Sequence, residues 1–330
     1  MRVLKLALVL ALAAGGCGGS TPTGGGGGSG GGGGSGPKNW LAGDHGTLAA
    51  TTDGVHYLTA SSRPTEANLL TLFCVTNQVG WAAGDGGVLL ATTNGGATWS
   101  LHATGVSVPL RAVAFADPAV GVAVGYGATV LRSSDGGVTW SASLLSGAAP
   151  STTLYAAAFA RDRSVAWLAG DGVIARSVDG GASFAAVAGV PAGSWRAIRF
   201  AADAVHGVAV AADGQVLLSS DGGASWQSAA TAPAALAGVS IAADGSRIVA
   251  VGAAGLVWRS NDAGVSFTRV DAGATADLAA VGFYDAGLEQ GWAVGGAGTV
   301  VHTLDGAASF AALSTGLSAD LTAVEDFAGY

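Results

Sequence analysis

One octet recurs along this chain in seven copies, the first of them shortened to TTDGVHY (51–57), and restricts what the chain can fold into. Its clearest copy, Ser-Ser-Asp-Gly-Gly-Val-Thr-Trp, occupies residues 133–140, and every copy ends in an aromatic residue. The closing aromatics are Tyr57, Trp99, Trp140, Phe184, Trp226, Phe267 and Phe310, at intervals of 41 to 44 residues. Because repeats of this length form stacks or rings of similar units, the spacing predicts an array or a propeller.

The polar residues of the octet are those of a tight hairpin. An Asp or Asn side chain can accept hydrogen bonds from N–H groups of its own turn, and the Gly residues after it supply positive φ. The residues at this position are Asp53, Asn94, Asp135, Asp179, Asp221, Asp262 and Asp305. We predict that they stabilise their own turns rather than form a catalytic or metal-binding array. The closing aromatics, among them Trp99, Trp140 and Trp226, are expected to pack over the hairpins.

Each unit can also be divided into four short strands. In the third unit we predict strands at residues 110–115, 120–125 and 129–134, with a fourth that begins at Thr139. Short, evenly spaced strands separated by Gly-rich turns are typical of a propeller.

The innermost strands indicate how the ring closes. Six are predicted before the last octet, at residues 70–75, 110–115, 154–159, 195–200, 236–241 and 278–283. The first octet has no such strand before it, but residues 321–327 supply one after the last octet. We therefore predict that residues 321–327 pair with residues 40–43 in the first blade and leave no open edge there. The predicted fold class is all-β, a seven-bladed β-propeller of four-stranded blades over residues 38–330.

The octet resembles the Asp-box of the BNR repeat families. Residues 133–140 agree with the Asp-box pattern at every fixed position. A longer phrase, GWAAGDGGVLLATTNGGATW at residues 80–99 and related phrases at 121–140 and 291–310, resembles the propeller repeats of the photosystem II assembly and stability factor family. In that family, arginines near the centre of the ring are associated with binding a partner protein. Other Asp-box propellers include sialidases, other glycoside hydrolases and binding proteins, so the resemblance is more specific for fold than for function.

The N-terminus resembles a bacterial lipoprotein signal. Arg2 and Lys5 form a positive start, an apolar run follows, and Gly15-Gly16 precede Cys17. We expect residues 1–17 to be an export signal with Cys17 as the lipidation site.

The alternative is ordinary cleavage near Ala13 or Ala14, which would release a secreted protein. Residues 18–37 are rich in Gly and Ser, and a flexible linker of this length spans about 25 Å. The predicted location is the cell envelope, anchored by lipid at the outer membrane or within the periplasm, with secretion as the alternative.

The charge of the chain limits its partners. The formal net charge is −8 and no basic patch is evident, so nucleic acid is not expected as a partner. Contact with a membrane is expected only through the lipid anchor. The sequence has no zinc, phosphate-loop or dinucleotide motif, so we predict no metal and no cofactor. We expect a monomer.

The candidate binding residues lie on the rim opposite the octets, where propellers more often bind ligands. The turns between second and third strands carry Asp44, Asp85, Tyr126 and Asp171, and the starts of the innermost strands carry Arg111, Tyr155, Trp195 and Arg196. Arginine and aromatic residues together are typical anchors of a protein interface, although salt-bridged strand ends would look the same. The acids could attract a cation or a basic peptide, or simply cap solvated turns.

A glycoside hydrolase needs carboxylates that this sequence scarcely offers. The chain has three Glu residues, Glu66, Glu289 and Glu325, and none is obviously beside Tyr126 or Tyr155 as the nucleophile pair of a sialidase requires. We predict a non-enzymatic scaffold that binds a protein or glycan partner, and we retain a glycan-binding or glycan-hydrolysing protein as the alternative.

Overall fold

The computed structural model describes residues 39–60, 64–160 and 162–326. These residues belong to one compact unit, Ser35–Tyr330. The export signal, Cys17 and the linker lie outside the described residues, so their assignments stay predictions.

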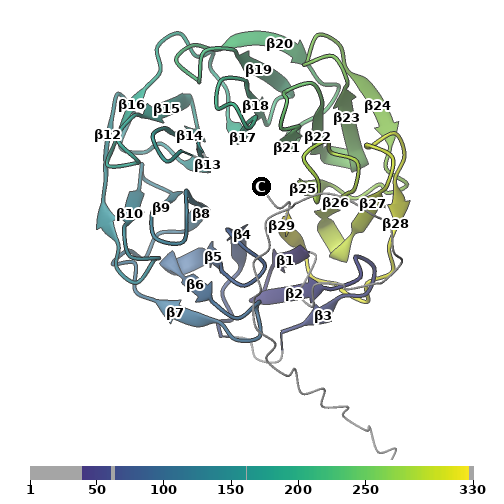
Figure 1. Ribbon diagram of the computed structural model, residues 1–330, viewed down its shortest axis with the longest axis horizontal. Coiled ribbons are helices and arrows are strands. Elements are labelled where there is room, and N and C mark those ends of the chain that lie inside the picture. The colour runs from purple at the N-terminus through teal and green to yellow at the C-terminus, as the bar shows by residue number, and fades with distance from the viewer. Residues whose placement is uncertain (1–38, 61–63, 161, 327–330) are drawn as a thin grey trace, which may run out of the picture. The chain divides into compact units, whose positions relative to one another are not determined.

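Seven antiparallel sheets stand around a common axis and confirm the predicted seven-bladed propeller (Figure 1). The innermost strands are β4 (Leu69–Cys74), β8 (Leu110–Phe115), β13 (Leu154–Phe159), β17 (Trp195–Phe200), β21 (Leu236–Ile241), β25 (Leu278–Phe283) and β29 (Leu321–Asp326). The second strands are β1 (Asn39–Gly43), β5 (Gly80–Gly84), β9 (Gly121–Gly125), β14 (Ala166–Gly170), β18 (Gly207–Ala211), β22 (Ile248–Gly252) and β26 (Gly291–Gly295).

The outer half of each blade is built from shorter strands. The third strands are β2 (Thr47–Thr51), β6 (Leu89–Thr92), β10 (Val130–Ser133), β15 (Val173–Ser177), β19 (Gln215–Ser219), β23 (Leu256–Ser260) and β27 (Val300–Thr303). The outermost strands are β3 (Leu58–Thr59), β7 (Ser100–His102), β11 (Ser141–Ala142), β16 (Ser183–Ala186), β20 (Gln227–Thr231), β24 (Thr268–Asp271) and β28 (Ala311–Ala312).

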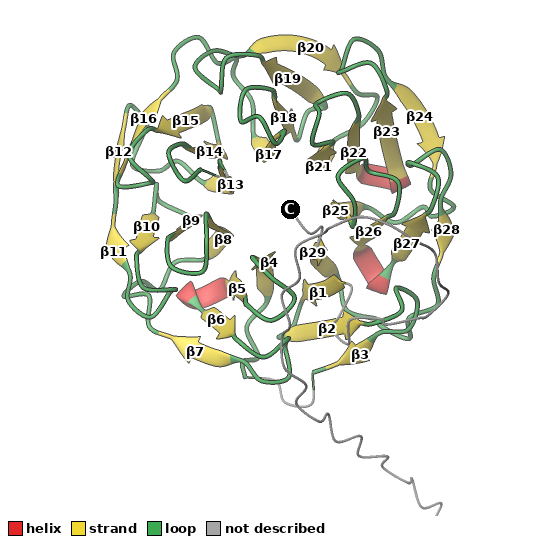
Figure 2. Cartoon of the chain, in the orientation of Figure 1, coloured by secondary structure: helices red, strands yellow, loops and turns green. Residues whose placement is uncertain are grey.

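Two departures from four regular strands occur in the described residues. Blade 4 gains a fifth strand, β12 (Leu144–Ser146), which pairs parallel to β16 as the chain leaves blade 3. Single 3-10 turns, η1 (Asp85–Gly87), η2 (Ala253–Gly255) and η3 (Gly296–Gly298), join second and third strands and are drawn in red in Figure 2. No helix of the described chain has the length and apolar character needed to cross a bilayer.

The core lies between blades rather than within a single layer. Every residue of all seven second strands is buried, because both faces of these strands pack against neighbouring blades. This burial explains their composition of Gly, Ala and Val with one Trp in several copies, since small side chains allow close packing of adjacent sheets.

In four of the seven blades, a tryptophan of the second strand contacts the next blade. Trp81, for example, stacks on Phe115 of the following blade with ring centroids 3.5 Å apart. Its indole N–H also donates to a Gly carbonyl in the octet of that blade. The three donor–acceptor pairs are Trp81 with Gly136, Trp167 with Gly222 and Trp292 with Gly54, each at 2.9 Å.

The ring closes as predicted. Strand β29 pairs antiparallel with β1, with Val324 opposite Leu41, so the end of the chain completes the first blade. The Trp292 bond to Gly54 adds a second link across the same junction. Figure 1 shows this meeting of the two ends of the described chain, with β29 next to β1.

Several predicted boundaries were wrong by one or two residues: in blade 3 the second, third and fourth strands begin at Gly121, Val130 and Ser141. The innermost strand of blade 2 begins at Leu69 and not at residue 70, because Leu69 pairs with Gly84 just as Leu110 pairs with Gly125 in blade 3. Leu70 therefore occupies the position that Arg111 occupies in blade 3.

Candidate functional site

The ring has two ends with different roles. The octets lie at one end, which we call the octet rim. The chain enters each innermost strand at the other end, which also carries the turns between second and third strands, and we call it the entry rim.

Octet carboxylates are bonded within their own hairpins. Asp135 Oδ1 accepts from Ser133 Oγ at 2.8 Å and from Thr139 N–H at 2.9 Å, while Oδ2 accepts from Thr139 Oγ1. These bonds favour the ionised form and lower the pKa of Asp135 to about 2. The same bonds and the same pKa, about 2, recur at Asp179, Asp221, Asp262 and Asp305.

The first two octets vary this arrangement. Asp53 accepts from the His56 N–H at 2.8 Å and lies 2.6 Å from His56 Nδ1, and these bonds lower the pKa of Asp53. In the second octet, Asn94 Oδ1 accepts from the Thr98 N–H at 3.0 Å. In both octets the polar side chain is occupied by its own turn.

The closing tryptophans pack over neighbouring rings. Trp99 meets Trp40 edge-on at 5.1 Å between centroids, and Trp140 meets Phe115 at 5.9 Å. Trp226 meets Phe200 in the same way at 5.7 Å. These rings cover the octet end of the interfaces between blades.

Every innermost strand carries a β-bulge at its second residue. In β8 the partners of Leu110 and Ala112 are the consecutive residues Gly125 and Val124, so Arg111 has no partner in the ladder. Bulges re-aim side chains and are frequent beside functional sites. The seven bulged residues are Leu70, Arg111, Tyr155, Arg196, Ala237, Ala279 and Thr322, in blade order from blade 2 round to blade 1. We call this set the bulge ring.

Three consecutive blades supply Arg, Tyr and Arg to the bulge ring, and their side chains meet. The guanidinium carbon of Arg196 lies 4.0 Å from the ring centroid of Tyr155, within the range of a cation–π contact. Arg111 lies 5.9 Å from the same centroid and donates a 2.8 Å hydrogen bond to the Tyr126 hydroxyl. Tyr126 comes from the turn between β9 and β10 and is 38% exposed.

A carboxylate holds the centre of this cluster in place. The Tyr155 hydroxyl donates to Asp171 Oδ2 at 3.2 Å, and Ser194 Oγ donates to Asp171 Oδ1. The structure thus brings together five of the residues proposed from the sequence, with two guanidinium groups and one carboxylate among them. We call these residues the Arg–Tyr cluster: Arg111, Tyr126, Tyr155, Asp171 and Arg196.

Other proposed residues do not join the cluster. Trp195 is fully buried, because it precedes the bulge and points between blades, so its proposed place on the binding surface was wrong. Asp85 lies on blade 2 and accepts from Asn68 Nδ2 at 3.1 Å, and Asp44 lies in the corresponding turn of blade 1. These two acids share the rim but come from blades 1 and 2, whereas the cluster is formed by blades 3, 4 and 5.

Residues just before the innermost strands were missed by the sequence reasoning. Asn68 accepts the His45 N–H of the preceding blade at 3.0 Å, and Asp277 accepts the Ala254 N–H in the same way at 2.8 Å. His45 and Ala254 have positive φ, so each acceptor fixes a turn of uncommon backbone conformation. The signal was available, since a polar residue precedes the innermost strand in most repeats.

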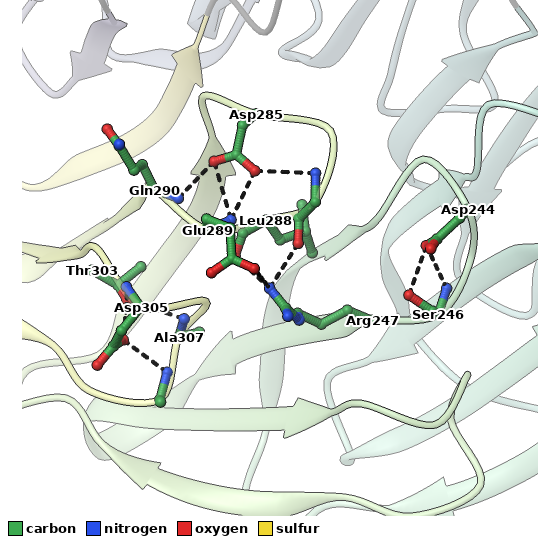
Figure 3. Close-up of polar contacts among 12 residues, drawn as sticks. Asp244, Ser246, Arg247, Asp285, Leu288, Glu289, Gln290, Thr303, Asp305 and Ala307 are labelled. Atoms are coloured by element: carbon green, nitrogen blue, oxygen red, sulfur yellow. Dashed lines mark hydrogen bonds and ion pairs between the residues drawn. The ribbon is translucent and has the colours of Figure 1, made fainter.

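The two tyrosines considered for the nucleophile pair of a sialidase have partners other than Glu. Tyr126 and Tyr155 pair with Arg111 and Asp171 rather than with Glu. Glu289 lies on the octet rim, where its Oε1 is 2.9 Å from Arg247 Nη1. Figure 3 shows this pair beside the octet of blade 7, in a group of loops from blades 6 and 7. Among the described residues, no three His, Cys, Asp or Glu side chains gather as metal ligands would.

Solved structures with the same architecture include YCF48 bound to D1 peptide, with 21% identity and a TM-score of 0.62 over 76% of this chain and 82% of that chain. YCF48 from Cyanidioschyzon merolae shares 21% identity and a TM-score of 0.61, over 78% and 88% of the two chains. The computationally designed Ika8 protein shares 18% identity and a TM-score of 0.57, over 77% and 76%. No protein-family model and no curated protein matches the chain.

These likenesses establish the fold. The resemblance to the propellers of the photosystem II assembly factor family, drawn from the repeats, is confirmed at that level.

Proposed function

We propose that this protein is a non-enzymatic scaffold that binds an extended segment of a partner protein at its entry rim. The observation that carries the proposal is the Arg–Tyr cluster. Three adjacent blades place Arg111, Tyr155 and Arg196 at bulged positions, which have no partner residue in the ladder with the second strand.

The chemistry of the cluster suits a peptide with an anionic group. Arg and Tyr are enriched among the residues that dominate protein interfaces. Two guanidinium groups that contact a single tyrosine ring present several N–H donors in a fixed arrangement, and such donors bind a carboxylate well. YCF48, which shares this fold, has been solved with a D1 peptide bound, so a ring of this architecture can hold a peptide.

Location forms the second part of the proposal. We propose that the domain works at the cell envelope, exported and held by a lipid on Cys17 at the end of the Gly/Ser-rich linker. A flexible linker of this length spans about 25 Å and would hold the domain off the membrane surface.

The test is capture of partners from the native envelope with the purified propeller as bait. The double variant Arg111→Ala/Arg196→Ala is compared with the wild type and with Arg269→Ala, whose side chain is exposed on the outermost strand of blade 6. We expect proteins that are retained by the wild type and by Arg269→Ala to be lost with the double variant. Circular dichroism and thermal unfolding of all three proteins show that the ring is intact.

Retention of the same proteins by the double variant would contradict a role for the Arg–Tyr cluster. Release of reducing sugar from envelope glycans by the wild-type protein would contradict the non-enzymatic assignment.

A further inference from the structure

The two halves of the bulge ring differ in side-chain size. Blades 3, 4 and 5 carry Arg111, Tyr155 and Arg196, whereas blades 6, 7 and 1 carry Ala237, Ala279 and Thr322. Because these side chains are small, an open depression of about 490 Å³ lies over blades 6, 7 and 1. Ala237 is the next member of the ring after Arg196, so the depression begins where the Arg–Tyr cluster ends.

Two carboxylates line this depression, Asp277 and Asp320, and both side chains are exposed. Asp277 Oδ1 accepts from the Ala254 N–H at 2.8 Å, and Asp320 Oδ1 accepts from the Ala297 N–H at 2.7 Å. These bonds hold the carboxylates in place. Oδ2 of each carboxylate accepts no hydrogen bond from the described part of the chain. The rest of the lining is mostly Ala and Leu.

We propose that the depression receives a Lys or Arg side chain of the same peptide whose anionic group lies on the Arg–Tyr cluster. This inference rests on the proposed function and adds the charge pattern of the partner. The small apolar floor accommodates the aliphatic stem of a long basic side chain, and the two carboxylates lie at the edge where its charged end would stay solvated.

Charge complementarity favours this occupant over others. The Arg–Tyr cluster presents two guanidinium groups together with Asp171, and the depression presents two carboxylates without a basic side chain in its lining, so a peptide with one acidic and one basic group matches both. Opposite charges at two places fix the direction and register of a bound chain more than they add to affinity. The partner segment is therefore expected to lie across the ring in a single orientation.

The test uses synthetic fluorescein-labelled Gly/Ser peptides with a C-terminal carboxylate and one Lys upstream. The spacing between them varies over about three to seven residues, which covers roughly 10–24 Å of extended chain. Matched peptides carry Gln in place of Lys. Binding is measured by fluorescence anisotropy at low ionic strength, where exposed charge pairs are least screened.

The decisive variant is Asp277→Asn/Asp320→Asn, which removes both charges but retains an acceptor oxygen for each turn. Asn68 already forms this bond in blade 2, to the His45 N–H of blade 1, so the substitution is compatible with the fold. At the best spacing we expect Lys→Gln to weaken binding to the wild type about fivefold, as for an exposed charge pair, and to have no effect on the variant. Ala279→Leu fills the depression and should also remove the preference for Lys.

The two proposals fail in different ways. If Lys and Gln peptides bind the wild type equally at every spacing, or if the Asn variant keeps the preference for Lys, the depression does not receive a basic side chain. If the Gln peptide binds Arg111→Ala/Arg196→Ala as well as it binds the wild type, the Arg–Tyr cluster itself is not the anchor and the proposed function fails with it.

Discussion

Replacing Trp292 by Phe tests how the ring is held closed. The substitution removes the indole N–H that donates to the Gly54 carbonyl at 2.9 Å across the junction of blades 7 and 1. It leaves a buried carbonyl without its partner, which costs about 1–3 kcal/mol. The smaller ring also leaves space beside Gly54, which adds about 1 kcal/mol. We therefore expect the free energy of unfolding to fall by about 2–4 kcal/mol and the melting temperature by about 3–7 °C.

The same substitution elsewhere in the ring provides the control. Trp81 and Trp167 make the same bond at the same distance at junctions of blades away from the closure of the ring. Trp81→Phe and Trp167→Phe should therefore lower the free energy of unfolding by about as much. Differential scanning calorimetry of the three variants gives the comparison. If Trp292→Phe leaves stability unchanged while the other two lower it, the junction of the last and first blades is not formed as described here. Hydrogen exchange should also be faster in β1 and β29 of Trp292→Phe than in the wild type.

Three further predictions concern pH and the octet turns. The pKa of the octet carboxylates that accept from a hydroxyl is about 2, below the ordinary 3.8. Their contribution to stability is therefore complete above about pH 4 and is lost as the pH falls toward 2. Urea unfolding at a series of pH values should show this decline, and a flat profile would contradict it. Burial raises the pKa of Glu325 in β29 to about 7, and the positive charge of Arg199 offsets part of this rise. The folded state therefore loses stability as the pH rises through 7. Glu325→Gln should raise the melting temperature at pH 8.5 and change it little at pH 4, whereas an equal effect at both pH values would refute the burial argument. Ser177 is buried and accepts the Gly181 N–H at 2.9 Å, so Ser177→Ala should cost about 1–2 kcal/mol in urea unfolding, and a neutral result would show that the octet hydroxyl contributes little.

Most of the fold could be predicted because its determinants are local and repeated. The Asp-Gly-Gly turns specify hairpins within a few residues, and counting octets against innermost strands predicted that residues 321–327 complete the first blade. The bond from Trp292 to Gly54 joins residues 238 positions apart. Such a partner can be identified only after the ring and its junction are known.

The candidate site was predicted only in part, for a reason that lies in the pairing of strands. Composition placed Trp195 beside Arg196 as a surface anchor, but the bulge turns these neighbours in different directions, and the Trp195 ring is buried. A bulge depends on which residues face each other across two strands, and the sequence of one strand does not show this. Asp277 and Asp320 were missed although a polar residue precedes the innermost strand in most repeats, because each acts on a turn of the preceding blade.

The bulged position also separates what the repeats share from what distinguishes them. The residue before it is Leu in six blades and Trp in the other, and it is buried in all seven. The bulged residue itself changes from Leu to Arg, Tyr, Arg, Ala, Ala and Thr around the ring. Because the bulged residue has no partner residue in the ladder, the fold accepts side chains from Ala to Arg there; at Thr322 the hydroxyl donates to the Leu69 carbonyl of the next blade at 2.6 Å. Such variation at one repeated position suits a binding surface: the two guanidinium groups of the Arg–Tyr cluster arise there, whereas Asp277 and Asp320 directly precede the innermost strands.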